Sequence, residues 1–276
     1  MSQPALSLAI RALEDSLGGR LLTRTTRQVR LTPEGGALLP QALRLLAEWD
    51  NVRERVHQRF TLQHGHIAIA SMPSFAGNVL PPLLRHFRER FPNVEIAVND
   101  VVQEQVLEMV QSGRVEIGFG FEPESSQGLA FEPLFEDQFI AIVPLSWPLK
   151  GARSVTWARL LTDNFIALQR PSSTRRLLED SLAAHGIELK AALECHQLAT
   201  VGQFVAAGLG VSVVPALCRS QMSAIGAQCL QLHRPLIRKS VGLIRRMDQE
   251  LSSVASAIRE TMRKKFASLS VAPNCR

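Results

Sequence analysis

The first hydrophobic pattern in the chain has the period of a helix. Its apolar residues recur at intervals of four, three and four positions, which places them on one helical face over residues 2–17. Pro4 fits the first turn, and Gly18 ends the pattern. The segment RLLTRTTRQVRLT then joins two short β-prone pieces through a polar tip, which predicts a small hairpin. The apolar positions of the helix are Leu6, Ile10, Leu13 and Leu17.

A longer helical pattern starts at Thr32, whose hydroxyl is a suitable N-cap before Pro33 at the first helical position. The apolar stripe that follows recurs at alternating intervals of four and three residues, which is the spacing of a coiled coil. We therefore predict a dimer seam, with packing of the helix on its own domain as the alternative, and a kink at Pro40. The seam residues are Leu38, Ala42, Leu45, Trp49, Val52 and Val56.

From Gly65 onward, apolar strands alternate with amphipathic helices. Three strands over residues 66–72, 94–100 and 115–121 are separated by two helical segments, and this order predicts a parallel α/β sheet. The segment PSFAGN after the first strand is predicted to be a loop. A second α/β unit of similar build follows, and the strand SVGLIRR with a helix over 250–266 closes the chain.

Length and composition support several folded units. The chain has 276 residues, of which 46% are hydrophobic and 20% charged, so two or three units with real cores are expected. Its net charge of +6 permits an anionic partner without choosing among nucleic acid, membrane and acidic ligand. The uncharged stretch 198–217 is long enough to span a bilayer, but its glycines and proline favour a helix, a turn and a buried strand.

The cysteines and the N-terminal residues indicate the compartment. Four cysteines without a CxxC spacing form no disulfide framework, which favours a reducing environment. No basic segment leads into an apolar core and a small-residue cleavage site at the N-terminus. We therefore predict a cytoplasmic protein that is not inserted in a membrane.

Arginines are concentrated in the first thirty residues, where they outnumber the acids Glu14 and Asp15. Such a cluster is typical of contacts with the phosphates of double-stranded DNA, although arginines on an ordinary solvated surface are the alternative. We take one position on the first helix and three on the hairpin as candidate phosphate contacts: Arg11, Arg24, Arg27 and Arg30.

Two hydroxyl-rich loops, SMPSFAGN and QRPSSTRR, each follow a strand and precede a helix. Exposed N–H groups and hydroxyls at such positions bind carboxylates and similar anions, which predicts a small-molecule site between the two α/β units. For any single residue, an ordinary helix N-cap is the alternative. The candidate effector-binding residues are Ser71, Ser74, Ser173, Thr174 and Arg175.

Motifs for catalysis, metals and cofactors are not recognised in the sequence. His64 and His66 have no third ligand near them, and the GxG of AAGLGVSVVP leads from a helix into a strand, the reverse of a dinucleotide site. G-x-S-x-G and H-E-x-x-H motifs are missing as well. We therefore predict no catalytic residue, no metal and no cofactor, and we do not expect an enzyme.

The segment SQPALSLAIRALEDSLGGRLLTRTTRQVRLTPEG resembles the recognition helix, wing and linker-helix start of LysR-type transcriptional regulators. GHIAIASMPSFAGNVLPPLLRHFRERFPNVEI and FVAAGLGVSVVP are similar to parts of their effector-binding domain. The resemblance implies an α/β fold with a winged helix-turn-helix, a linker helix, and two α/β subdomains of periplasmic-binding-protein type around an effector cleft. It also implies a homodimer or homotetramer on a bipartite DNA site.

Single residues carry the resemblance further. Gln3, Pro4 and Ser7 match the groove-facing positions of the family, together with Arg24 and Arg27 on the wing. Leu8 departs from the pattern, since many members have arginine there and one base or phosphate contact is thereby lost. Where the third strand begins, Glu116 replaces the aspartate that is frequent in the family, and we attach no meaning to this exchange.

The family has two further helices before the recognition helix, and Met1 stands in their place. Those helices bury the apolar face of the recognition helix, and each leucine-sized side chain so buried is worth roughly 1.5–3 kcal/mol. We therefore expect the chain to be truncated within the winged helix-turn-helix and its DNA binding to be impaired. A start codon placed too far downstream, a fragment, and a regulator that dimerises without binding DNA are the three explanations.

The predicted function is that of a ligand-responsive, DNA-binding transcriptional regulator. A small-molecule-binding module without DNA activity, similar to solute-binding proteins, is the alternative. The predicted domains are a partial winged helix-turn-helix (1–32), a linker helix (33–63) and an effector-binding domain (64–276). Within the last, we predict one subdomain over 64–138 and 241–270 and a second over 139–240.

Overall fold

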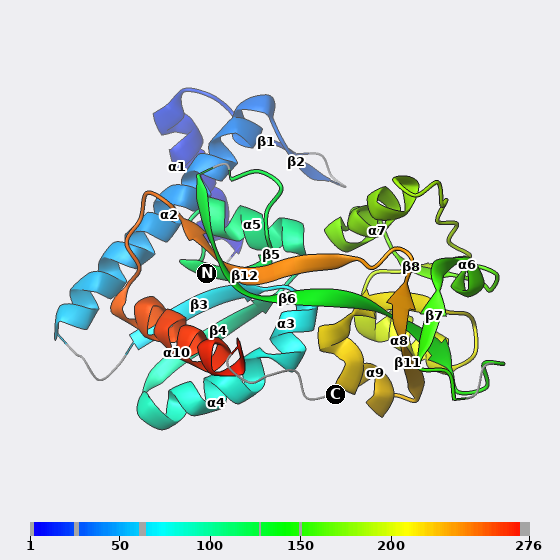
Figure 1. The fold of residues 1–276 in the computed structure, drawn as a ribbon. Coiled ribbons are helices and arrows are strands. Elements are labelled where there is room, and N and C mark those ends of the chain that lie inside the picture. The colour runs from blue at the N-terminus through cyan, green and yellow to red at the C-terminus, as the bar shows by residue number, and fades with distance from the viewer. Residues whose placement is uncertain (1–2, 25–27, 61–64, 127, 149–150, 271–276) are drawn as a thin grey trace.

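A computed structural model of the chain describes residues 3–24, 28–60, 65–126, 128–148 and 151–270 (Figure 1). Its first part confirms the predicted helix, hairpin and long helix. Gly18 has a positive φ of 74°, the left-handed conformation that ends a helix. Thr32 caps the long helix by accepting a hydrogen bond from the Gly35 N–H at 3.0 Å. The elements are α1 (Gln3–Leu17), β1 (Leu22–Arg24), β2 (Val29–Leu31) and α2 (Pro33–Phe60).

The first α/β half has a sheet in the order β4-β3-β5-β12-β6. Its first three strands are parallel, as predicted, whereas β12 and β6 run antiparallel to their neighbours. Helices α4 and α10 cover one face, and α5 packs against the other. The elements are β3 (Gly65–Ser71), α3 (Pro73–Asn78), α4 (Leu80–Arg90), β4 (Val94–Asp100), α5 (Gln103–Gln111), β5 (Ile117–Phe121), β12 (Arg238–Arg246) and α10 (Ser253–Ser270).

The prediction of a loop for PSFAGN was wrong, because these residues form the short helix α3. Glycine and asparagine are poor helix formers, so local preference argues against a helix here. Tertiary packing overrides that preference. Phe75 is fully buried and stacks on Phe119 with ring centroids 4.9 Å apart.

Two long strands connect the halves, as Figure 1 shows. Residues 129–138 of β6 (Leu129–Pro144) pair with β12, while residues 139–144 pair with β10 (Ser212–Pro215) and β11 (Ala227–His233). The partner of β6 therefore changes between Gln138 and Phe139. A single strand carries the hydrogen bonding of one half directly into the other.

The second half is built around β10, the end of β6, and β11. The uncharged stretch 198–217 contains the helix α8, a turn at Gly208 with φ 82°, and the buried strand β10. Among the described residues, no helix has the length and apolar character needed to cross a membrane. The remaining elements are β7 (Ser154–Thr156), α6 (Trp157–Leu160), β8 (Ile166–Leu168), α7 (Ser173–Ala183), β9 (Leu193–Cys195), α8 (Leu198–Ala206), η1 (Ala216–Cys218) and α9 (Arg219–Ala224).

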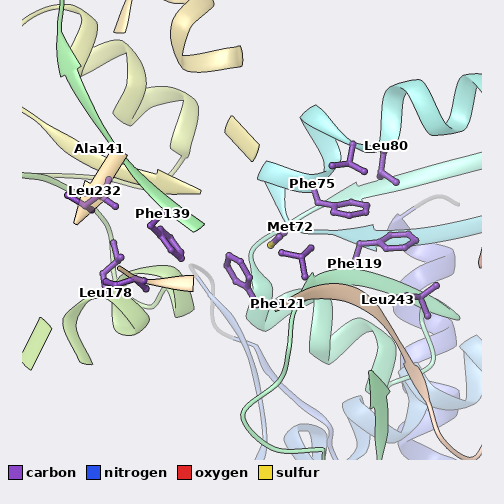
Figure 2. Packing of buried hydrophobic residues seen from close by; sticks show 14 of the residues in the cluster. Met72, Phe75, Leu80, Phe119, Phe121, Phe139, Ala141, Leu178, Leu232 and Leu243 are labelled. Carbon is purple, nitrogen blue, oxygen red and sulfur yellow. The ribbon is translucent and has the colours of Figure 1, made fainter. Parts of the chain in front are cut away.

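Alternation along the strands divides the core between the two faces of each sheet. Ile69 faces the α4 and α10 side, and its neighbour Ala70 faces α5. Figure 2 shows the aromatic contact that joins the cores of the two halves. Phe121, at the end of β5, lies 6.1 Å from Phe139 of β6 between ring centroids. Both rings are at least 96% buried, so this contact seals the boundary against water.

Asp137 lies one residue before the point where β6 changes partner, and it is only 5% exposed. Its Oδ2 accepts a hydrogen bond from the Leu217 N–H at 3.4 Å, which ties β6 to η1. Burial raises the pKa of this carboxyl from 3.8 to about 6, although backbone N–H groups of Leu217, Gln138 and Ala216 lower it.

We expect this carboxyl to make folding stability depend on pH. A raised folded-state pKa stabilises the fold below the ordinary value of 3.8, and this contribution is lost as the pH rises through about 6. The full effect is up to about 3 kcal/mol. The free energy of unfolding of Asp137→Asn, measured with urea, is therefore expected to rise relative to that of the native chain as the pH increases from about 4 to about 6. If the difference in unfolding free energy between the two proteins stays constant with pH, the raised pKa of Asp137 is contradicted.

Candidate functional site

A cleft of about 260 Å³ lies between the two halves. Its walls come from the carboxyl ends of β3, β4, β5, β8 and β9 and from the helices that follow, which is where α/β sheets bind ligands. The first half contributes residues 72–74, 77, 100–105 and 121, and the second contributes 168–169, 171–174, 196–199 and 221. A ligand in this cleft would contact both halves at once.

Gln103 fixes the start of α5 at the floor of the cleft. Its side-chain Nε2 donates to the Phe121 carbonyl at 2.9 Å, and its Oε1 accepts from the Phe121 N–H at 2.9 Å. Gly120 makes this possible, because a Cβ there would lie 2.1 Å from Gln103 Oε1. Gln103 therefore acts as an extra strand partner for β5 and sets the position of the next residue, Glu104.

Glu104 and Ser173 meet across the cleft. The Ser173 hydroxyl, on α7 of the second half, donates to Glu104 Oε1 at 2.6 Å. The other carboxylate oxygen, Oε2, is buried and has no hydrogen-bond partner among the described residues. Sequence reasoning missed Glu104, Gln103 and Asp100. Their place at or just after the end of β4 was the available signal, but the predicted effector residues were hydroxyls and one arginine.

The structure brings three of the five candidate effector residues to the cleft wall: Ser74, Ser173 and Thr174. Ser71 lies behind the wall, where its fully buried hydroxyl donates to the Met72 carbonyl. Arg175 is also turned away from the cleft. Its guanidinium pairs with Glu179 and Glu194 and donates to the Leu168 carbonyl at 3.0 Å, so it fastens α7 to β8 and β9.

Acidic groups dominate the charge of the cleft. The described residues that line it include the carboxylates of Asp100 and Glu104 but no lysine or arginine. Partial burial raises the pKa of Asp100. The first turn of α8 opens onto the cleft without an acidic residue or a side-chain cap, so its N–H groups are the positive feature of the wall.

None of the three cysteines in the described part of the chain lines the cleft. Cys218 is fully buried, and burial raises the pKa of its thiol to about 12, which keeps it protonated. Cys195 is buried in the core beside α8.

The N-terminal part presents an exposed surface. No side chain of α1 is buried, and its apolar residues Leu6, Leu13 and Leu17 are each about half exposed. The candidate residues Gln3, Pro4 and Arg11 are exposed, whereas Ser7 is half-buried. In the hairpin, β1 and β2 pair antiparallel, with Thr23 opposite Arg30.

Sequence comparison assigns both parts of the chain. Residues 61–267 match the profile described as "LysR substrate binding domain", and residues 1–36 match "Bacterial regulatory helix-turn-helix protein, lysR family". The chain belongs to the LysR family of transcriptional regulators. It is thus a ligand-responsive regulator with a DNA-binding segment and an effector-binding domain. The alternative of a binding module without DNA activity is not better supported.

Individual LysR relatives agree with this assignment. A "probable HTH-type transcriptional regulator", LrrA of Synechococcus elongatus, is 35% identical over 217 residues, which is 79% of this chain and 73% of its own. The crystal structure of the LysR family regulator CbnR superimposes with a TM-score of 0.72 at 21% identity, over 96% of this chain and 90% of CbnR. The effector-binding domain of QuiR, solved with shikimate, superimposes with a TM-score of 0.67 at 16% identity, over 74% of this chain and 98% of the QuiR domain.

The long helix α2 has two different faces. Ala47 is buried and lies beside Gly113 of the first half, and Glu54 on the same face accepts a hydrogen bond from the His66 N–H. On the opposite face, the predicted seam residues Leu45, Trp49 and Val52 are 65%, 65% and 44% exposed. Leu38 and Ala42 are half-buried. Arg27 lies outside the described residues, as do the side chains of Arg24 and Val56.

Glu116, at the position where the family often has aspartate, has a structural role. Its Oε2 accepts a hydrogen bond from the Ser252 N–H at 2.8 Å, and Ser252 in turn caps α10 by accepting from the Ala255 N–H. The carboxylate thus fastens the start of α10 to the sheet.

We expect Gln103→Ala to destabilise the effector-binding domain by about 2–4 kcal/mol, because a buried N–H and a buried carbonyl of Phe121 would both lose their partner. Chemical denaturation of the native chain and the variant measures this difference. Gln105→Ala is the matched control, since this exposed glutamine lies two residues further along the same helix. Equal stability of the two variants would show that the two hydrogen bonds between Gln103 and Phe121 do not stabilise the fold.

Proposed function

We propose that this LysR-type regulator binds a small molecule with an anionic group in the cleft between its two halves. Binding would change the angle between the halves and so the placement of the DNA-binding segments in a homodimer or homotetramer. The observation that carries the proposal is the cleft itself, which is lined from both halves at the carboxyl ends of their strands.

Two features support an anionic group. The uncapped first turn of α8 offers backbone N–H groups at the cleft wall, and such helix starts favour negative charge. The effector-binding domain of QuiR, which shares this fold, is solved with shikimate, a carboxylate. Ser74, Ser173 and Thr174 are the proposed hydroxyl contacts. Ser71 and Arg175 would act from behind the wall by holding its shape.

The proposed boundary between the subdomains is residue 138/139, where β6 changes its strand partner. The first subdomain then takes up residues 64–138 and 241–270, and the second residues 139–240. A regulator binds its effector without converting it, and it works in the compartment that holds the chromosome. We therefore propose a cytoplasmic protein that is not an enzyme.

The proposed dimer forms through the exposed face of α2. Burial of Leu45, Trp49 and Val52 between two copies would remove from water the apolar area that a single chain leaves exposed. The opposite face, with Ala47, is already occupied by the first half of the same chain. Each copy would thus keep its own effector domain while sharing the seam.

We expect Leu45→Glu and Trp49→Glu to shift the protein from dimer toward monomer without lowering its unfolding midpoint as a monomer, since both side chains are exposed in the single chain. Analytical ultracentrifugation over a concentration series measures the shift. Arg44→Glu is the matched control, because Arg44 is 48% exposed on the same helix and no seam residue lies three or four positions from it. Equal dissociation by the control would disprove this seam.

The proposed DNA surface combines α1 and the hairpin. Gln3, Pro4 and Ser7 would approach base edges in the major groove, and Arg11, Arg24, Arg27 and Arg30 would contact phosphates. Because no side chain of α1 is fully buried, its apolar face contributes little to holding the helix in place, and we expect the 276-residue chain to bind DNA weakly.

Replacing Arg11 or Arg30 by alanine is expected to reduce the slope of log K against log salt by about one for each lost phosphate contact. Fluorescence anisotropy with a duplex selected from a randomised library measures this slope. Arg85→Ala is the control, as this 83% exposed arginine lies on α4, away from the DNA surface. If all three variants keep the native slope, the proposed surface is wrong.

A further inference from the structure

We propose that the effector carries a protonated amino group in addition to its anionic group, and that Glu104 binds this amino group. The inference rests on the proposed function of the cleft and specifies the chemical class of its ligand. It predicts a small zwitterion of the amino-acid type.

The first argument is the unpaired oxygen of Glu104. Its Oε1 accepts the Ser173 hydroxyl at 2.6 Å, but Oε2 is buried without a partner. Among the described residues that are not exposed, Glu104 Oε2 is the one buried side-chain nitrogen or oxygen atom that has no hydrogen-bond partner. A buried acceptor without a donor costs free energy, so a ligand that supplies the donor gains affinity.

The second argument is the charge of the wall. Glu104 and Asp100 contribute two carboxylates, and no lysine or arginine lines the cleft in the described part of the chain. A ligand with negative charge alone would meet repulsion from both acids. An ammonium group would instead form a charge-assisted hydrogen bond with Oε2, which is the stronger kind.

An acid in the first turn of a helix has an ordinary explanation, since it offsets the positive end of the helix dipole. Such an acid normally has water or helix N–H groups around both oxygens. Glu104 differs because one oxygen is committed to the opposite half of the molecule and the other is enclosed without a donor. Helix stabilisation alone does not account for this arrangement.

The two ligand charges would have separate places. The uncapped start of α8 on the second half suits the anionic group, and Glu104 on the first half suits the amino group. A zwitterion spanning both would connect the halves, which a simple anion at α8 would not. The cleft volume of about 260 Å³ is sufficient only for a small metabolite.

Isothermal titration calorimetry with the full chain tests the proposal. The probes are the proteinogenic L-amino acids, the 2-hydroxy acids that correspond to alanine, leucine and phenylalanine, and shikimate. We expect at least one amino acid to bind, and its 2-hydroxy acid, which lacks only the ammonium group, to bind at least about tenfold more weakly.

Variants then locate the amino group. Glu104→Gln keeps the shape and removes the charge, and it is expected to weaken binding of that amino acid by about tenfold. Glu108→Gln is the matched control, because this exposed glutamate lies one turn further along α5, outside the cleft lining. Gly77→Phe fills the cleft from a position where a Cβ meets no atom within 4 Å, and it is expected to abolish binding.

Thermal unfolding without added probe shows whether each variant is folded. The inference is overturned if no amino acid binds, if the 2-hydroxy acids or shikimate bind as tightly as the amino acids, or if Glu104→Gln binds like Glu108→Gln. If shikimate binds tightly and Gly77→Phe abolishes that binding, the cleft binds an anionic ligand as proposed, but the ligand needs no amino group. Binding that survives Gly77→Phe overturns both, since the ligand then lies outside the cleft.

Discussion

The passage of β6 through both halves of the effector-binding domain is the constraint on which the other features depend. Its first ten residues pair with β12 and its last six with β10 and β11, so one strand sets the register of two sheets. Backbone hydrogen bonds hold such a strand along its length, which leaves the point where its partner changes as the natural place for bending. The cleft lies beside that point.

The packing around this point restricts how the halves can move. Phe121 and Phe139 close the boundary from the two sides (Figure 2). Asp137 ties β6 to η1 just before it. If one half rotates, these contacts must either stay intact or all be replaced at once. In a close-packed core, moving one buried group alone costs free energy. A ligand that bridges Glu104 and the start of α8 would act on this same boundary.

The long helix α2 lies between the first half of the effector-binding domain and the DNA-binding segment. Its buried face lies on the first half, through Ala47 beside Gly113 and Glu54 at His66. The second half holds the α8 side of the cleft. A change in the angle between the halves would therefore move the second half relative to the helix that carries α1 and the hairpin.

The sequence by itself determined the order of elements and the family. Periodic apolar positions placed α1, α2 and most strands and helices of the two halves, because side-chain spacing depends on local geometry alone. It did not reveal α3, whose poor helix formers are held by the burial of Phe75. Nor did it show that β12 runs antiparallel to its neighbours β5 and β6, since pairing direction depends on contacts between distant segments.

The site divides in the same way. Strand-to-helix loops rich in hydroxyls indicated Ser74, Ser173 and Thr174, because loop position and residue type are local properties. Only the tertiary structure turned Arg175 toward Glu179 and Glu194 and away from the cleft. It also brought Glu104 against Ser173, sixty-nine residues away in the chain. Charge and hydrogen-bond satisfaction in a cleft are properties of what surrounds each group, and those surroundings exist only after the chain has folded.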